Sequence, residues 1–223
     1  LHRDGRLVGE LCRCLSVTLT RFYRQAAAKE GRDPLPSAAP AQLQFIQRFG
    51  SRLNLHLHVH AVVSDGIFAL ESGAAGERLL FVPVCEPSRE DIERLTEGLR
   101  RKIVKRFTAL GVIPQEVAEE MLAWPNGGFS LDGSVRVEPE DRKALERLLS
   151  YCTRPAISLR RLEYRAEDER VRYRPNKGME GAPHLIEWTP VEFLTRFSRL
   201  IPPPRKNLVR YAGALGPRSV LRP

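Results

Sequence analysis

Three of the five histidines stand at alternate positions of one apolar segment, at His56, His58 and His60. In an extended strand alternate residues share a face, so the three imidazoles would line one side and the leucine and valine side chains the other. Two imidazoles at this spacing lie about 6.6 Å apart along the strand and can converge on one metal ion, whereas the third is about twice as far away. Neutral imidazole is the commonest metal ligand in proteins. The segment therefore predicts half of a metal site, and the alternative is a solvated polar strand face.

The other ligands of such a site would come from a neighbouring strand. Gln47 lies on the preceding apolar run and is the nearest polar candidate, and His56 is the less favoured alternative. Cys12 and Cys14 have no second pair at the spacing of a zinc ribbon. The residues alone leave open which two of the three histidines would share the ion.

Tyr151 is one of five tyrosines, and it stands at the end of a predicted helix. It ends a segment of helical period, and Pro155 stops that helix shortly afterwards. A hydroxyl at a helix end can be held rigidly and still face a groove. A phenol has a pKa of about 10, so it needs activation to attack at neutral pH. From the residues alone, a packing aromatic with an exposed polar tip is the commoner role.

The elements that would position these residues alternate between the two hydrophobic periods. Residues 43–49 and 53–63 predict an antiparallel hairpin, followed by strands at 67–70 and 78–84, a strand pair within 130–137, and a small β meander over 157–188. Helices are predicted over 6–29, 89–111, 115–123, from Pro139 to about Tyr151, and from a capping box at Thr189–Glu192 to about Leu200. The fold class is therefore α+β, an antiparallel sheet carrying the His-x-His strand with helices packed on it.

The charge is concentrated at the C-terminal end. The 223 residues carry a net charge of +9, and no acidic residue follows Glu192. Residues 193–223 hold seven Lys or Arg residues, which leaves 29 basic and 27 acidic residues before them. Such a proline-rich basic tail predicts contact with nucleic acid, or else a solvated terminus.

The composition also excludes some classes of protein. No apolar run is long enough to span a bilayer, and four scattered cysteines do not make a disulfide-rich secreted scaffold. We expect no membrane association and a cytoplasmic location. The chain opens on Leu1 with no signal peptide, which predicts a fragment of a longer protein.

Three blocks of sequence carry a resemblance to a known family. They are QRFGSRLNLHLHVH at 47–60 followed by Asp65 and Gly66, LSYCTRPAIS at 149–158, and the pair IPPPR at 201–205 and RYAG at 210–213. In this order they resemble the rolling-circle insertion-sequence transposases, tyrosine transposases of the HUH type (His-hydrophobic-His). The resemblance covers nearly the whole chain from about residue 40.

The resemblance implies an HUH endonuclease-like fold and a specific chemistry. It identifies His58 and His60 as ligands of Mg²⁺ or Mn²⁺, and Tyr151 as the nucleophile that cleaves and joins single-stranded DNA at transposon ends and target, through a 5′-phosphotyrosine link. Arg147, Arg154, Arg205, Lys206 and Arg210 would contact the DNA backbone. The expected cellular setting is the bacterial cytoplasm, in association with DNA.

Two departures from the family pattern qualify this reading. Many members carry a second tyrosine four residues before the first, where this chain has Arg147. A cysteine-rich zinc-binding segment, usual before this region, is also missing from the sequence. The chain thus predicts a single-tyrosine variant in three regions, with catalysis at 1–155, a small β and helix extension at 156–192, and a DNA-contacting tail at 193–223. The alternatives are a non-catalytic or decayed DNA-binding fragment and, far less favoured, a zinc hydrolase.

Overall fold

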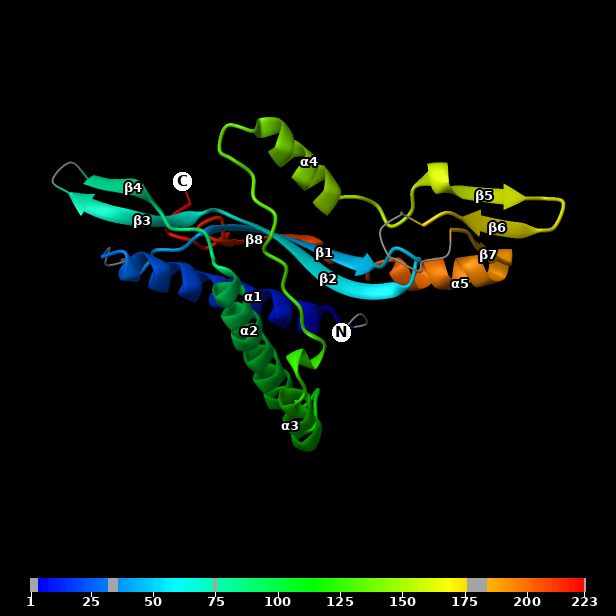
Figure 1. The fold of residues 1–223 in the computed structure, drawn as a ribbon, viewed down its shortest axis with the longest axis horizontal. Coiled ribbons are helices and arrows are strands. Elements are labelled where there is room, and N and C mark those ends of the chain that lie inside the picture. Colours follow the sequence, from blue (N-terminus) through cyan, green and yellow to red (C-terminus); the bar gives the residue numbers. More distant parts are fainter. Residues whose placement is uncertain (1–3, 32–35, 74–75, 176–183, 223) are drawn as a thin grey trace. The chain divides into compact units, whose positions relative to one another are not determined.

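The computed structural model describes the chain except residues 1–3, 32–35, 74–75, 176–183 and 223 (Figure 1). The described residues form two compact units that interleave in sequence. Unit 1 contains Phe45–His60 and Arg142–Leu208, and unit 2 contains Asp4–Gln44, Ala61–Asp141 and Val209–Pro223. The two units are defined by compactness, whereas the sequence divided the chain by functional role, into 1–155, 156–192 and 193–223. That division stays a prediction.

Unit 2 contains the long helices. They are α1 (Gly5–Lys29), α2 (Arg89–Ala109) and α3 (Gln115–Ala123), followed by a 3-10 turn at Asn126–Gly128. The side chain of Asp4 caps α1 by accepting from the backbone N–H of Arg6 at 2.8 Å, and Ser88 and Asp91 form a capping box at the start of α2. These helices confirm the predictions for 6–29, 89–111 and 115–123.

The core of unit 2 joins α1 to a hairpin and to α2. Strands β3 (Gly66–Gly73) and β4 (Gly76–Pro83) pair antiparallel along their whole length. Tyr23 and Ala27 of α1 pack against Ile67 and Ala69 of β3, while Cys14 packs with Ile103 and Phe107 of α2. Apolar side chains of α1 are therefore buried against both the β3–β4 hairpin and α2, as the helical period of α1 predicts.

Two strands belong in part to both units. They are β1 (Ala41–Phe49) and β2 (Leu55–Val63), neighbours in a sheet of order β2-β1-β8. Their adjacency agrees with the predicted hairpin. The third strand, β8 (Val209–Gly213), was not predicted, because its residues were assigned to the basic tail.

Unit 1 contains the predicted β meander. Strands β5 (Leu162–Arg165), β6 (Arg170–Tyr173) and β7 (Ile186–Trp188) pair antiparallel in sequence order. Helix α5 (Pro190–Leu200) starts at the predicted capping box, where Thr189 and Glu192 bond each other's backbone N–H groups at 2.8 and 3.3 Å. A core of Leu53, Tyr173, Trp188 and Leu200 holds these elements together.

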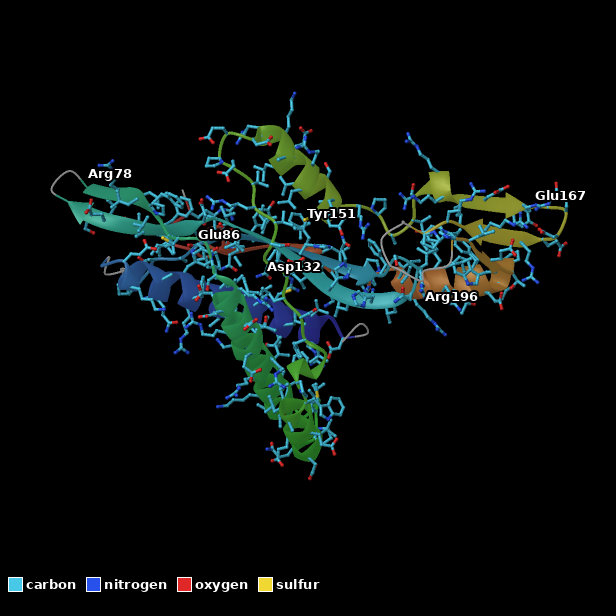
Figure 2. All side chains as sticks on the ribbon, in the orientation of Figure 1. Arg78, Glu86, Asp132, Tyr151, Glu167 and Arg196 are labelled. Atoms are coloured by element: carbon cyan, nitrogen blue, oxygen red, sulfur yellow. The ribbon has the colours of Figure 1, made fainter. Side chains whose placement is uncertain are left out.

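Two local predictions are wrong. Residues 130–137 form no strand; the Asp132 side chain instead accepts from the Ser134 N–H at 2.9 Å, which makes a local turn (labelled in Figure 2). Helix α4 spans Arg142–Cys152 and not 139–151, because the Asp141 N–H bonds the Glu138 carbonyl at 3.0 Å and places Pro139 in a turn. In both places a short-range hydrogen bond replaces the predicted element.

Candidate active site

Strand β2 holds the three histidines in a row. The ring centroids of His56 and His58 lie 5.1 Å apart, and those of His58 and His60 lie 4.9 Å apart. His56 is exposed, whereas His58 and His60 are half-buried. The pair predicted to bind metal is therefore the pair that the fold shields from water.

Each of the two half-buried imidazoles offers a nitrogen lone pair. The His58 Nδ1 lies 3.2 Å from the His56 carbonyl, which can only accept a hydrogen bond, so Nδ1 carries the proton and Nε2 keeps its lone pair. The His60 Nε2 is buried and has no hydrogen-bond partner among the described residues. Burial lowers the pKa of both rings, and the positive charge of Arg154 lowers it further. Both imidazoles are thus kept in the neutral form that binds metals.

Gln47 of β1 is oriented by the end of α4. Its Nε2 donates to the Cys152 carbonyl at 2.9 Å and to the Tyr151 carbonyl at 3.5 Å. Because carbonyls only accept, the amide oxygen must face away from them. That oxygen, Oε1, is buried without a hydrogen-bond partner in the described part of the chain. Gln47 therefore presents an unused oxygen donor.

Tyr151 lies beside these groups at the C-terminal end of α4 (labelled in Figure 2). Its ring centroid is 5.3 Å from that of His60, with the ring planes inclined at 73°. Its side chain is 49% exposed, so the phenol is open to an incoming molecule. Residues 60 and 151, far apart in the sequence, are thus in contact.

The five predicted DNA-contacting residues have different surroundings. Arg147 is exposed on α4, and Arg205 and Lys206 are exposed after α5. Arg210 of β8 lies against α1, where a Cβ added to Gly9 would come within 3.4 Å of its Nη1. Arg154 contacts the Tyr151 ring, with its Cζ 4.6 Å from the ring centroid.

Sequence reasoning missed Phe49, the last residue of β1. Its ring centroid is 5.8 Å from the Arg154 Cζ. The signal available in the sequence was the position of Phe49 between Gln47 and Gly50, in the first of the blocks that resemble the transposase family. An aromatic residue in an apolar run is more often a core residue, so the sequence did not single it out.

The metal prediction can be compared with the donor set. Across the residues that the structure describes, no group of three or more His, Cys, Asp or Glu side chains could hold an ion. Two neutral imidazoles and one amide oxygen are available as donors, with His60 Nε2 and Gln47 Oε1 both buried and unpartnered in the described chain. Imidazole nitrogen suits transition metals such as zinc better than Mg²⁺, which prefers oxygen ligands, so Mg²⁺ or Mn²⁺ stays a prediction from the family resemblance.

A family model described as "Putative transposase" matches residues 42–220. The match covers most of the chain, so the protein belongs to this transposase family, a family of DNA-processing and therefore DNA-binding proteins. No curated protein and no solved structure matches the chain. None of the described helices has the length and apolar character needed to cross a membrane.

Proposed function

We propose that this transposase cleaves and joins single-stranded DNA through a covalent link to Tyr151, in an HUH-type site that uses Mg²⁺ or Mn²⁺. The observation that supports this most directly is the contact between the Tyr151 and His60 rings, 5.3 Å between centroids. A nucleophile and a metal ligand must share one phosphate, and this contact allows it.

In the proposed reaction the Tyr151 oxygen attacks the phosphorus of a phosphodiester. The new phosphorus–oxygen bond to Tyr151 forms as the bond to the 3′ oxygen breaks, and the proton lost by the phenol is balanced by the one that the 3′ oxygen gains. The products are a 5′-phosphotyrosine and a free 3′-OH, which can later reverse the reaction on another strand. One phosphoester replaces another, so no nucleotide cofactor is required.

His58, His60 and Gln47 would hold the divalent ion. When bound, the ion supplies Lewis-acid stabilisation of the negative charge on the phosphate oxygens. The Cys152 carbonyl orients Gln47, and the His56 carbonyl orients His58, so the backbone sets the direction of two of the three donors.

A single nucleophile follows from Arg147. Position 147 is one turn before Tyr151 on α4, and an arginine there cannot alternate with Tyr151 as a nucleophile. We therefore infer one covalent step for each protein molecule.

The test uses the full chain, a labelled pool of single-stranded oligonucleotides of random sequence, and Mn²⁺ or Mg²⁺. The expected product is a covalent protein–DNA adduct on a denaturing gel, with the label on the 5′-phosphate side. Tyr151→Phe should abolish it, and His58→Ala with His60→Ala should reduce it by about a hundredfold or more. Tyr164→Phe is the matched control, because Tyr164 is a similarly exposed tyrosine of unit 1, at 59%.

The second candidate function is DNA binding without catalysis. The observation in its favour is the basic, acid-free stretch after Glu192. It predicts salt-dependent binding of single strands with no adduct under either ion. An adduct that survives Tyr151→Phe would instead show that the nucleophile is assigned to the wrong residue.

A further inference from the structure

Arg154 differs from the other predicted DNA-contacting residues because aromatic rings enclose it. Its Cζ lies 4.6 Å from the ring centroid of Tyr151 and 5.8 Å from that of Phe49. Phe49 belongs to the partly buried rim of the unit 1 core, as do Ala156 and Ile157, which follow Arg154 after Pro155. The backbone on both sides of the stack is therefore anchored, and the guanidinium is held on the nucleophile's ring.

The charge of Arg154 lacks a counterpart. Its Nε is buried and forms no hydrogen bond to any described residue, and no acidic side chain of the described chain pairs with it. Aromatic faces attract a cation, but they do not satisfy its N–H donors. Withdrawing an ionised group from water is costly unless an opposite charge meets it. The missing partner is thus an anion, and it must reach a point next to the Tyr151 ring.

We propose that Arg154 binds the reacting phosphate itself, the one that becomes joined to Tyr151, rather than a remote phosphate of the strand. This rests on the proposed function and assigns a separate role within it. The planar guanidinium can donate two parallel hydrogen bonds to phosphate oxygens while its face stays on the phenol ring. The same side chain then orients the nucleophile and neutralises the phosphate that the nucleophile attacks.

In this role Arg154 contributes far more to the rate of cleavage than to the affinity for single-stranded DNA. Arg154→Ala should lower the rate of adduct formation by about a hundredfold or more, the usual effect of removing one preorganised donor. Its affinity for single strands should fall less than about threefold, because one phosphate contact among many is lost. Arg154→Lys should recover only part of the rate, since an ammonium keeps the charge but not the fork of donors.

Arg160→Ala is the matched control, because Arg160 is also an arginine of unit 1 but lies exposed on the 3-10 turn Leu159–Arg161 and has no place in the proposed site. We expect it to keep the wild-type rate of adduct formation. Adding guanidinium ion at constant ionic strength should restore part of the rate to Arg154→Ala and leave Arg160→Ala unchanged. Rescue of this kind cannot come from a protein that has simply failed to fold. Equal losses in the two alanine variants, or no rescue, would overturn the proposal.

A second measurement keeps this proposal separate from the covalent chemistry. Inorganic phosphate should raise the thermal midpoint of the wild-type protein and of Arg160→Ala, and raise that of Arg154→Ala much less. This shift is expected even if no adduct ever forms, an outcome that would refute only the proposed function. An equal shift in all three proteins would refute the role of Arg154.

Discussion

Strand β1 carries three buried glutamines that serve its two units in different ways. In unit 2 the Gln42 Nε2 donates to Thr20 Oγ1 and to the Ser16 carbonyl at 3.2 and 3.4 Å, and its oxygen accepts from Gln44, which also donates to the Cys12 carbonyl at 3.3 Å. In unit 1 the Gln47 nitrogen is bonded, but its oxygen is buried without a partner among the described residues. Buried polar atoms are normally paired, so an unpaired one indicates a ligand or water that the chain itself does not supply.

The arginines repeat this contrast. Arg100 of unit 2 is almost fully buried, yet it pairs with Glu97 at 2.7 Å and donates to the carbonyls of Met121, Leu122 and Trp124 at the end of α3. Arg154 of unit 1 has aromatic contacts and no acidic partner in the described chain. Gln42, Gln44 and Arg100 thus join elements of unit 2, whereas Gln47 and Arg154 of unit 1 each keep a buried polar atom without a partner in the described chain, as Arg210 of unit 2 does at its Nε.

The largest expected effect comes from replacing Gln47, and the same replacement of Gln44 provides the comparison. Gln47→Leu should raise the Mn²⁺ concentration needed for half-maximal adduct formation by about a hundredfold, because it removes an oxygen donor. Gln44→Leu should leave that concentration unchanged and lower the free energy of unfolding by about 1 kcal/mol, through lost hydrogen bonds. Metal titration and urea unfolding measure the two effects. A similar response of both variants in both assays would remove the distinction between the units.

Gly213 makes a close backbone contact with Pro40 within unit 2. It has φ of +57°, and an added Cβ would lie 1.9 Å from the Pro40 carbonyl oxygen, which also accepts from the Ala214 N–H at 2.9 Å. Gly213→Ala should therefore lower the free energy of unfolding by about 2 kcal/mol, from strain and from the displaced contact. Gly98→Ala serves as the control in thermal unfolding, because nothing lies within 4 Å of a Cβ added to Gly98 in α2. An unchanged midpoint for Gly213→Ala would mean that the contact with Pro40 is dispensable.

The pH dependence of stability should distinguish the half-buried histidines. Burial lowers the pKa of His58 and His60 in the folded protein, so the unfolded chain takes up protons first as the pH falls below about 6.5. The free energy of unfolding, measured with a chelator present, should decrease from pH 7.5 to pH 5.5. The double variant His58→Asn and His60→Asn should show a smaller decrease. An equal decrease in the wild-type protein and in the double variant would contradict this assignment.

The smallest effect is expected for an ion pair of unit 2. Hydrogen bonds from Arg106, at 2.8 Å, and from Arg13 lower the pKa of Glu10 to about 2. A carboxyl group whose pKa is lowered in the folded state stabilises the fold at pH values above its ordinary pKa. This stabilisation is lost as the pH falls toward 2. Glu10→Gln should remove that part of the acid dependence and leave adduct formation at pH 7 unchanged. An identical acid unfolding curve for the variant would show that the pair is fully screened.

Much of the fold follows from local patterns. The apolar period of α1 and α2, the capping boxes of α2 and α5, and the alternation in β2 each specify an element from a few neighbouring residues. The prediction failed at residues 130–137 and at β8. An isolated turn stands within residues 130–137 where a strand was predicted. Segment β8 is a strand because it pairs with β1, which lies far away in the sequence.

The sequence by itself determined the chemistry that is available: alternate histidines on one strand face, a tyrosine at a helix end, and a match to a transposase family over residues 42–220. Only the tertiary structure decided which groups meet. It placed His60 against Tyr151, turned the Gln47 oxygen away from α4, and laid Arg154 between the rings of Tyr151 and Phe49. The contacts that join β1 and β2 to the end of α4 and to Arg154 span about a hundred positions of sequence, and they depend on the packing of whole elements, which no local pattern encodes.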